Sequence, residues 1–164
     1  KSNGITLEQY LSHMSNNDSI HLWFDIKNLN LELSDLIFNK IEVLLKQNNI
    51  SKTRVLIESV FPEALIPFAQ NGYITSYYLP NLDDLKYESI LPIMERAKEF
   101  IVTHGVTGIS QSIEDIQYAK IYLPDVPKFT WALSSEPYSK RSLIDLEHII
   151  NENKDIKVML ISKH

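Results

Sequence analysis

The chain has 164 residues, which is the size of one domain and enough to bury a sizeable hydrophobic core. Its net charge of −5 argues against a general nucleic-acid-binding protein, because such proteins usually carry a basic stripe. The sequence has no cysteine, which excludes disulfides, thiol catalysis and cysteine-bound zinc, and no apolar run approaches the ~18 residues of a membrane-spanning helix.

The apolar pattern predicts helices and strands that alternate along the chain. A short amphipathic helix opens at Thr6, where the run Thr6-Leu7-Glu8-Gln9 has the form of a capping box. The apolar stretch 20–30 contains the first strand. Further strands are predicted over residues 53–59, 73–79, 106–110, 129–133 and 156–162, and further helices over 33–47, 62–69, 87–102, 113–121 and 142–153.

This order predicts an α/β protein with parallel β/α repeats. Two architectures fit: an open doubly wound sheet, and part of a (β/α)₈ TIM barrel. A complete barrel usually needs ~250 residues, so this chain, with about six of the eight strands, corresponds to about three quarters of one. No linker or low-complexity segment divides the chain, and residues 1–164 are expected to form a single domain lacking the N-terminal strands of the barrel.

The first strand carries two charged residues in an apolar run. Because strand side chains alternate, Trp23, Asp25 and Lys27 share one face, and the apolar residues between them share the other. The carboxyl ends of parallel strands are where chemistry usually occurs in α/β folds. We interpret Asp25 and Lys27 as a functional carboxylate and lysine; the alternative is a purely structural ion pair.

Further candidates lie at the ends of later strands. Asp25 and Glu58 fall near the carboxyl ends of successive strands, so we expect them to converge on one mouth. Mg²⁺ or Ca²⁺ takes several oxygen ligands, and two carboxylates would be an incomplete set. Trp131 is expected to line an apolar part of the site, although a core tryptophan is the alternative. The chain has no GxGxxG motif or P-loop, which argues against a nucleotide-binding Rossmann protein.

Several short segments occur in a familiar order. Residues 4–11 (GITLEQYL) resemble a "PTLEEVL" segment, and residues 24–27 (FDIK) resemble an "IEIK" strand. Residues 57–65 (IESVFPEAL) resemble "QSFDPEAL", and residues 131–134 (WALS) resemble "WTVN". In this order the chain resembles the glycerophosphodiester phosphodiesterase superfamily. Residues 22–29 (LWFDIKNL) are most similar to the "LDFKN" of its divergent menorin-like branch.

This resemblance implies a barrel that hydrolyses a small phosphodiester with a divalent cation, Mg²⁺ or Ca²⁺. It implies that Asp25 is a metal ligand, that Lys27 is a catalytic residue near the phosphate and that Trp131 contacts the substrate. Glu58, at the same mouth, is the second candidate for substrate binding.

The resemblance covers the C-terminal three quarters of the family's barrel. The strands that carry the family's catalytic histidines and "ExD" metal ligands are therefore expected to precede this chain, as a separate segment of the same barrel. Asp25 replaces a glutamate, Ser134 replaces an asparagine, and Lys163 stands near an expected aspartate. These departures leave open a second interpretation, a non-catalytic binding or interaction module derived from such a barrel.

Overall fold

The computed structural model describes residues 4–14, 19–82, 85–134 and 139–163. Six parallel strands form one sheet in the order β1-β2-β3-β4-β5-β6. The strands are β1 (Leu22–Asp25), β2 (Val55–Ser59), β3 (Ile74–Tyr78), β4 (Gly108–Ser112), β5 (Lys128–Ser134) and β6 (Ile156–Lys163). The helices are α1 (Leu7–Met14), α2 (Ser34–Gln47), α3 (Ile66–Gln70), α4 (Tyr87–His104), α5 (Ile116–Tyr122) and α6 (Lys140–Glu152).

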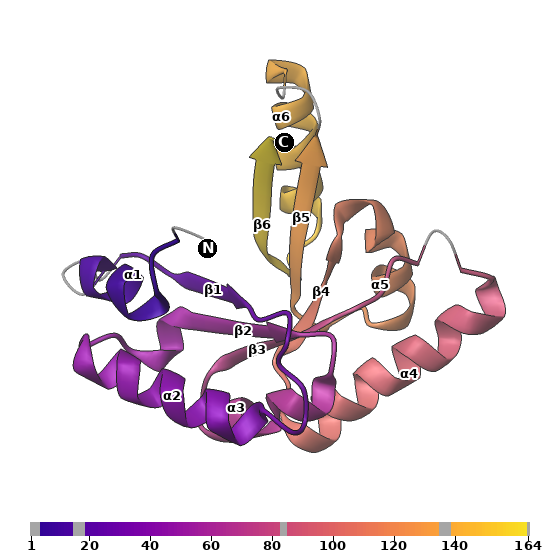
Figure 1. Ribbon diagram of the computed structural model, residues 1–164. Coiled ribbons are helices and arrows are strands. Elements are labelled where there is room, and N and C mark those ends of the chain that lie inside the picture. Colours follow the sequence, from indigo (N-terminus) through magenta and orange to yellow (C-terminus); the bar gives the residue numbers. More distant parts are fainter. Residues whose placement is uncertain (1–3, 15–18, 83–84, 135–138, 164) are drawn as a thin grey trace.

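The sheet curls into half a barrel, with α2, α3 and α4 along its convex outer side (Figure 1). The parallel α/β fold is thus confirmed. The strand order also decides between the two predicted architectures, because neighbours in sequence are neighbours in space throughout. A doubly wound sheet would reverse its order at a switch point. The structure is therefore a partial barrel of β/α units.

The predicted elements are present, with boundary shifts that have local causes. The fourth strand begins at Gly108 rather than at Val106, because the backbone N–H groups of Gly105 and Val106 both bond to the carbonyl of Phe100 and extend the end of α4. Gly105 adopts φ 73°, the left-handed conformation that favours glycine at a helix C-terminus. Pro92 lies inside α4 and does not mark its start.

The predicted helix over 62–69 forms as two parts, a 3₁₀ turn at Pro62–Leu65 followed by α3. Pro67 has no N–H to donate to the carbonyl of Glu63, so a continuous α-helical ladder cannot form there. The helix over 113–121 divides in the same way, into a 3₁₀ turn at Ile113–Asp115 and α5.

The capping box at the first helix is confirmed by reciprocal hydrogen bonds. The backbone N–H of Thr6 donates to Oε1 of Gln9 at 2.9 Å, and the N–H of Gln9 donates to Oγ1 of Thr6 at 3.2 Å. Together these bonds satisfy two of the N–H groups that a helix start leaves unpaired.

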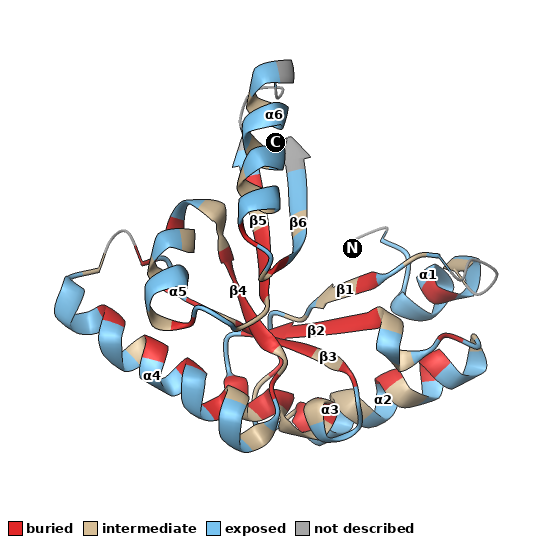
Figure 2. Ribbon diagram, turned by 180° about the vertical axis from the view of Figure 1, so that it is seen from behind, coloured by how far each residue is buried: buried red, intermediate tan, exposed pale blue. Residues whose placement is uncertain are grey.

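The main core lies between the outer face of the sheet and the helices. Buried positions follow β2 to β5 and the sheet-facing sides of α2 to α4 (Figure 2). Phe68 at its centre makes edge-to-face contacts with Phe38 and Tyr73, with ring centroids 5.3 and 5.5 Å apart. Among the described helices none is long and apolar enough to cross a membrane.

Candidate functional site

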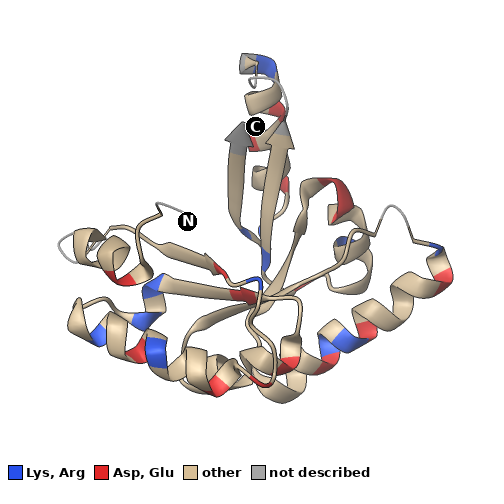
Figure 3. Ribbon diagram, viewed as in Figure 1, with Lys and Arg blue, Asp and Glu red and all other residues tan. Residues whose placement is uncertain are grey.

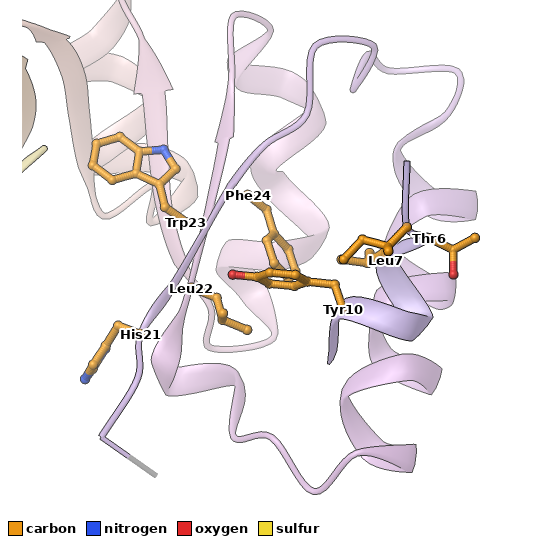
Figure 4. Close-up of a pocket in the computed structure, with 8 residues that line it drawn as sticks. Thr6, Leu7, Tyr10, His21, Leu22, Trp23 and Phe24 are labelled. Carbon is orange, nitrogen blue, oxygen red and sulfur yellow. The ribbon is translucent and has the colours of Figure 1, made fainter. Parts of the chain in front are cut away.

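The parallel register brings two carboxylates together. Asp25 lies opposite Glu58 where β1 and β2 end, so the predicted convergence of these residues on one mouth is confirmed. The predicted alternation along β1 is confirmed as well: Leu22 and Phe24 belong to the helix-covered core, whereas Trp23 and Asp25 face the concave side of the sheet. Figure 4 shows Trp23 leaving the strand on the side opposite to Phe24.

A pocket of about 340 Å³ opens on the concave side of the sheet. All four residues that the sequence analysis selected line it: Asp25, Lys27, Glu58 and Trp131. The rest of the lining is aromatic or aliphatic and consists of Trp23, Tyr78, Leu133 and Leu160. Basic and acidic residues are also found over the helices and at the starts of β5 and β6, and both signs meet where β1 and β2 end (Figure 3). The pocket thus combines a small charged cluster with a broad apolar wall.

Asp25 and Lys27 form an ion pair inside this pocket, with 2.6 Å between Oδ2 and Nζ. The hydrogen bond to Asp25 is the main cause that raises the pKa of Lys27, so the side chain is a cation at neutral pH. The Lys27 side chain is 74% exposed, and an ion pair this open contributes little to stability. The ion pair is therefore present at a position that a ligand can reach, and a functional role for Asp25 and Lys27 stays a prediction.

Glu58 is the buried member of the cluster. Only 2% of its surface is exposed, and within the described part of the chain its Oε2 has no hydrogen-bond partner. Burial raises the pKa of Glu58 to about 7, and the Asp25 charge adds to this, while Ser110 and Lys27 lower it by less. The carboxyl therefore exists in both protonation states near neutral pH and can donate or accept a proton there.

Aromatic rings form the opposite wall. Tyr78 and Trp131 are stacked, with centroids 5.1 Å apart and ring planes at 20°, and Nζ of Lys27 lies 5.2 Å from the centroid of Tyr78. Its neighbour Tyr77 points to the other face and is buried in the main core. Trp131 is therefore a pocket residue rather than a core tryptophan.

Tyr78, Leu133 and Leu160 are pocket residues that the sequence did not indicate. Tyr77 and Tyr78 are adjacent in one strand, so only one of them can face the pocket, and the strand pattern alone does not say which. The missing signal was the register between the strands. Glu58 is opposite Ser76, which shares a face of β3 with Tyr78, and Tyr78 is opposite Ser110. Ser112, on the same face as Ser110, is opposite Trp131, and Trp131 is opposite Leu160, so Tyr78, Trp131 and Leu160 belong to the face that carries Glu58.

The donor set does not complete a metal site. The residues that the structure describes contain no group of three or more His, Cys, Asp or Glu side chains placed to hold a metal ion. Asp25 and Glu58 supply carboxylates at this pocket, but a hard cation takes six or more oxygen ligands. Asp25 as a metal ligand therefore stays a prediction, and these residues alone do not fit Mg²⁺ or Ca²⁺. The side chains of Ser134 and Lys163, which depart from the resembled motifs, lie outside the described ones.

A second hollow lies beside the free edge of β1, between that strand and α1 (Figure 4). Tyr10 and Leu7 of α1 and Leu22 and Phe24 of β1 contribute its apolar lining, and His21 lies at its border. It has no charged cluster comparable to the one at the strand ends, so the concave pocket is the better candidate for chemistry.

Comparison with known protein families and with curated proteins finds no match to this chain. The features that bear on function are therefore the geometry of the pocket and the short motifs that contain Asp25, Lys27 and Trp131.

Proposed function

We propose that this chain forms the larger part of a phosphodiesterase-like barrel, and that its concave pocket binds a small phosphodiester. The observation that carries the proposal is the convergence of Asp25, Lys27, Glu58 and Trp131 on one pocket at the carboxyl-terminal edge of a parallel sheet. Active sites of barrel enzymes lie at that edge.

Different pocket residues contact different parts of the phosphodiester. Lys27 is exposed and cationic, and it exchanges its contact with Asp25 for one with a phosphate oxygen. Tyr78 and Trp131 contact the alcohol groups of the diester. Glu58, with its pKa near 7, holds a proton that it can give to or take from a bound oxygen atom.

The shape of the sheet supports a barrel that another segment completes. β1 and β6 are the edge strands of the described sheet. On the concave side Leu133 and Leu160 are 51% and 45% exposed, although apolar side chains inside a barrel are normally packed. We propose that a segment with further strands pairs with these edges. That segment would also supply the catalytic histidines and the remaining metal ligands that the resemblance implies, with Asp25 as one ligand of a divalent cation.

A second candidate function is a non-catalytic binding module derived from such a barrel. It is favoured by the lining of the pocket, which includes two carboxylates, Asp25 and Glu58, and no histidine among the described residues. Lys27 already neutralises Asp25, which reduces its availability to a cation.

Intrinsic fluorescence offers a direct test of phosphodiester binding. The chain contains two tryptophans, and both Trp23 and Trp131 line the pocket. Titration with diethyl phosphate should produce a saturable change, and Lys27→Met should weaken the affinity by about ten-fold, the effect of one charge-assisted contact. Lys98→Met, an exposed lysine of α4, is the matched control and should bind as the unmodified chain does. No saturable change, or equal affinities for the two variants, would overturn the proposal.

Activity separates the two candidate functions. The chain is incubated with glycerophosphocholine and Mg²⁺, alone and together with the polypeptide encoded directly upstream of it, and choline release is measured. Release that needs that polypeptide and disappears in Asp25→Ala supports the enzyme. Binding without release in either mixture supports the module.

A further inference from the structure

Lys27 lies in a tight turn just after β1, where its backbone is anchored but its side chain is long. The N–H of Leu29 donates to the carbonyl of Ile26 at 3.0 Å and closes the turn. Leu29 is fully buried, and its carbonyl accepts the hydroxyl of Ser59 at 2.8 Å. A lysine side chain is a flexible four-carbon stem with a compact charge at its end. The place of the ammonium group therefore depends on what that group contacts.

A carboxylate and an aromatic ring hold this ammonium group in the pocket. Asp25, at the end of β1, pairs with Nζ of Lys27 at 2.6 Å. The ring of Tyr78 lies under the same atom, with 5.2 Å between Nζ and the ring centroid, which is a cation–π distance. Because β2 lies between β1 and β3, this second contact crosses the sheet. Trp131 stacks on the Tyr78 ring, with centroids 5.1 Å apart, and supports it from β5.

These two contacts respond differently to a bound anion. A phosphate oxygen competes with the Asp25 carboxylate, because both are negative acceptors for the same N–H donors. The ring of Tyr78 attracts a cation through its quadrupole and carries no net charge, so it does not repel the anion. The ammonium group of Lys27 has three N–H donors. It can therefore turn one of them to a phosphate oxygen while it stays over the ring.

We propose that Tyr78 is a positioning residue for Lys27, and that its ring keeps the ammonium group in the pocket when Asp25 releases that group to a bound anion. The phosphodiester as this anion rests on the proposed function. The place of the ammonium group rests only on the Tyr78 ring and on Trp131 behind it. Because the ring face makes the contact and the hydroxyl does not, phenylalanine should replace Tyr78 and leucine should not.

The position of the ammonium group can be measured without a ligand. Protons over the face of an aromatic ring are shifted upfield in NMR spectra, and we expect this shift for the Hε protons of Lys27 in chain labelled with ¹³C-lysine. Lys27→Met identifies the signal. The shift should persist in Asp25→Asn and in Tyr78→Phe and disappear in Tyr78→Leu. Lys52, whose Nζ lies 5.9 Å from the ring centroid of Tyr73, is the internal control and should not change in any variant.

A double-mutant cycle tests the role of Tyr78 in binding. Calorimetry gives the affinity for diethyl phosphate of the unmodified chain, Tyr78→Leu, Lys27→Met and the double variant. Tyr78→Leu should weaken binding by about three-fold more when Lys27 is present than when it is absent, the effect of one exposed cation–π contact. Tyr78→Phe should bind as the unmodified chain does. Tyr87→Leu, at an exposed tyrosine of α4, is the matched control.

The outcomes distinguish this inference from the proposed function. If the upfield shift of Lys27 is lost in Asp25→Asn, the positioning role is wrong. If Tyr78→Leu weakens binding equally with and without Lys27, the positioning role is wrong and the phosphodiester site stands. If the shift behaves as expected and diethyl phosphate does not bind, Tyr78 positions Lys27 and the phosphodiester site is wrong. Far-ultraviolet circular dichroism confirms that each variant is folded, and Tyr78→Phe keeps the ring should Tyr78→Leu fail to fold.

Discussion

Lys128 and Glu58 are both buried in the sheet, but their charged groups differ in how many hydrogen-bond partners they have. Lys128 opens β5, is fully buried, and donates from Nζ to the carbonyls of Leu123 at 2.7 Å and Val126 at 2.9 Å, besides pairing with Asp155. Glu58 is the next-to-last residue of β2 and is only 2% exposed, yet its Oε2 has no partner in the described structure. The first lies at the amino-terminal edge of the sheet and the second at the carboxyl-terminal edge. In barrels these edges serve stability and function respectively, and the two side chains follow that division.

The largest effect on stability is expected when Lys128, the side chain with several partners, is replaced. Lys128→Met would leave the Asp155 carboxylate and two carbonyls without their shared donor. Loss of one partner from a buried ion pair typically destabilises by about 3–5 kcal/mol. Because Asp155 is 19% exposed, we expect the lower end of that range. Urea unfolding measures the change, with exposed Lys98→Met as a control near zero. A loss below about 1 kcal/mol would mean that Lys128 is not a structural element.

The raised pKa of Glu58 predicts that the stability of the fold depends on pH. The pKa of Glu58 is about 7 in the folded protein against an ordinary value of 4.5, so between these pH values the folded state binds a proton that the unfolded state has released. This contribution to stability is therefore present at low pH and declines as the pH rises from about 4.5 to 7. Its size is at most about 3 kcal/mol, from 1.36 kcal/mol per pKa unit.

Glu58→Gln isolates this contribution, because glutamine has a similar shape and does not titrate. The free energy of unfolding, measured in urea at pH 5 and pH 8, should fall less with pH in the variant than in the unmodified chain. Parallel pH profiles for the two proteins would contradict the raised pKa.

The smallest expected effects come from replacing two buried serines, Ser59 and Ser110, one at a time. Ser59 donates to the carbonyl of Leu29 and accepts from the N–H of Phe61 at 3.0 Å. Oγ of Ser110 has no described partner in good hydrogen-bond geometry, and it interacts with the Glu58 carboxyl, whose pKa it lowers. Ser59→Ala should destabilise by about 1–2 kcal/mol, and Ser110→Ala by less than about 0.5 kcal/mol. Thermal or urea unfolding compares them directly. Equal losses would show that the Ser110 hydroxyl has a structural partner after all.

Local patterns in the sequence were sufficient for much of the fold. The capping box at Thr6 is confirmed, because such a box involves groups only three residues apart. The alternation along β1 also placed Asp25 on the pocket side, since strand geometry fixes the side-chain period. Lys27 lines the same pocket from the turn that follows β1, beyond the predicted strand alternation. The features that the sequence predicted correctly are therefore those set by residues only a few positions apart.

The remaining features depend on pairing between distant segments. The choice between a barrel and an open sheet required the strand order. The choice between Tyr77 and Tyr78 required the phase of β3 relative to β4. Ser76 gave no signal, because a small polar residue within a strand is common, and only the register shows that it lies opposite Glu58.

The uninterrupted strand order also determines how the chain can come apart. Each strand of the described sheet pairs with its neighbours in sequence, so most long-range contacts join adjacent β/α units, as in repeat proteins. Such pairing keeps the contacts of each unit with the units on either side of it. It also permits opening from the ends inward: the terminal unit of α6 and β6 can detach while β2, β3 and β4 keep both neighbours. The molecule is thus expected to unfold sequentially, one β/α unit at a time, beginning at an end of the sheet.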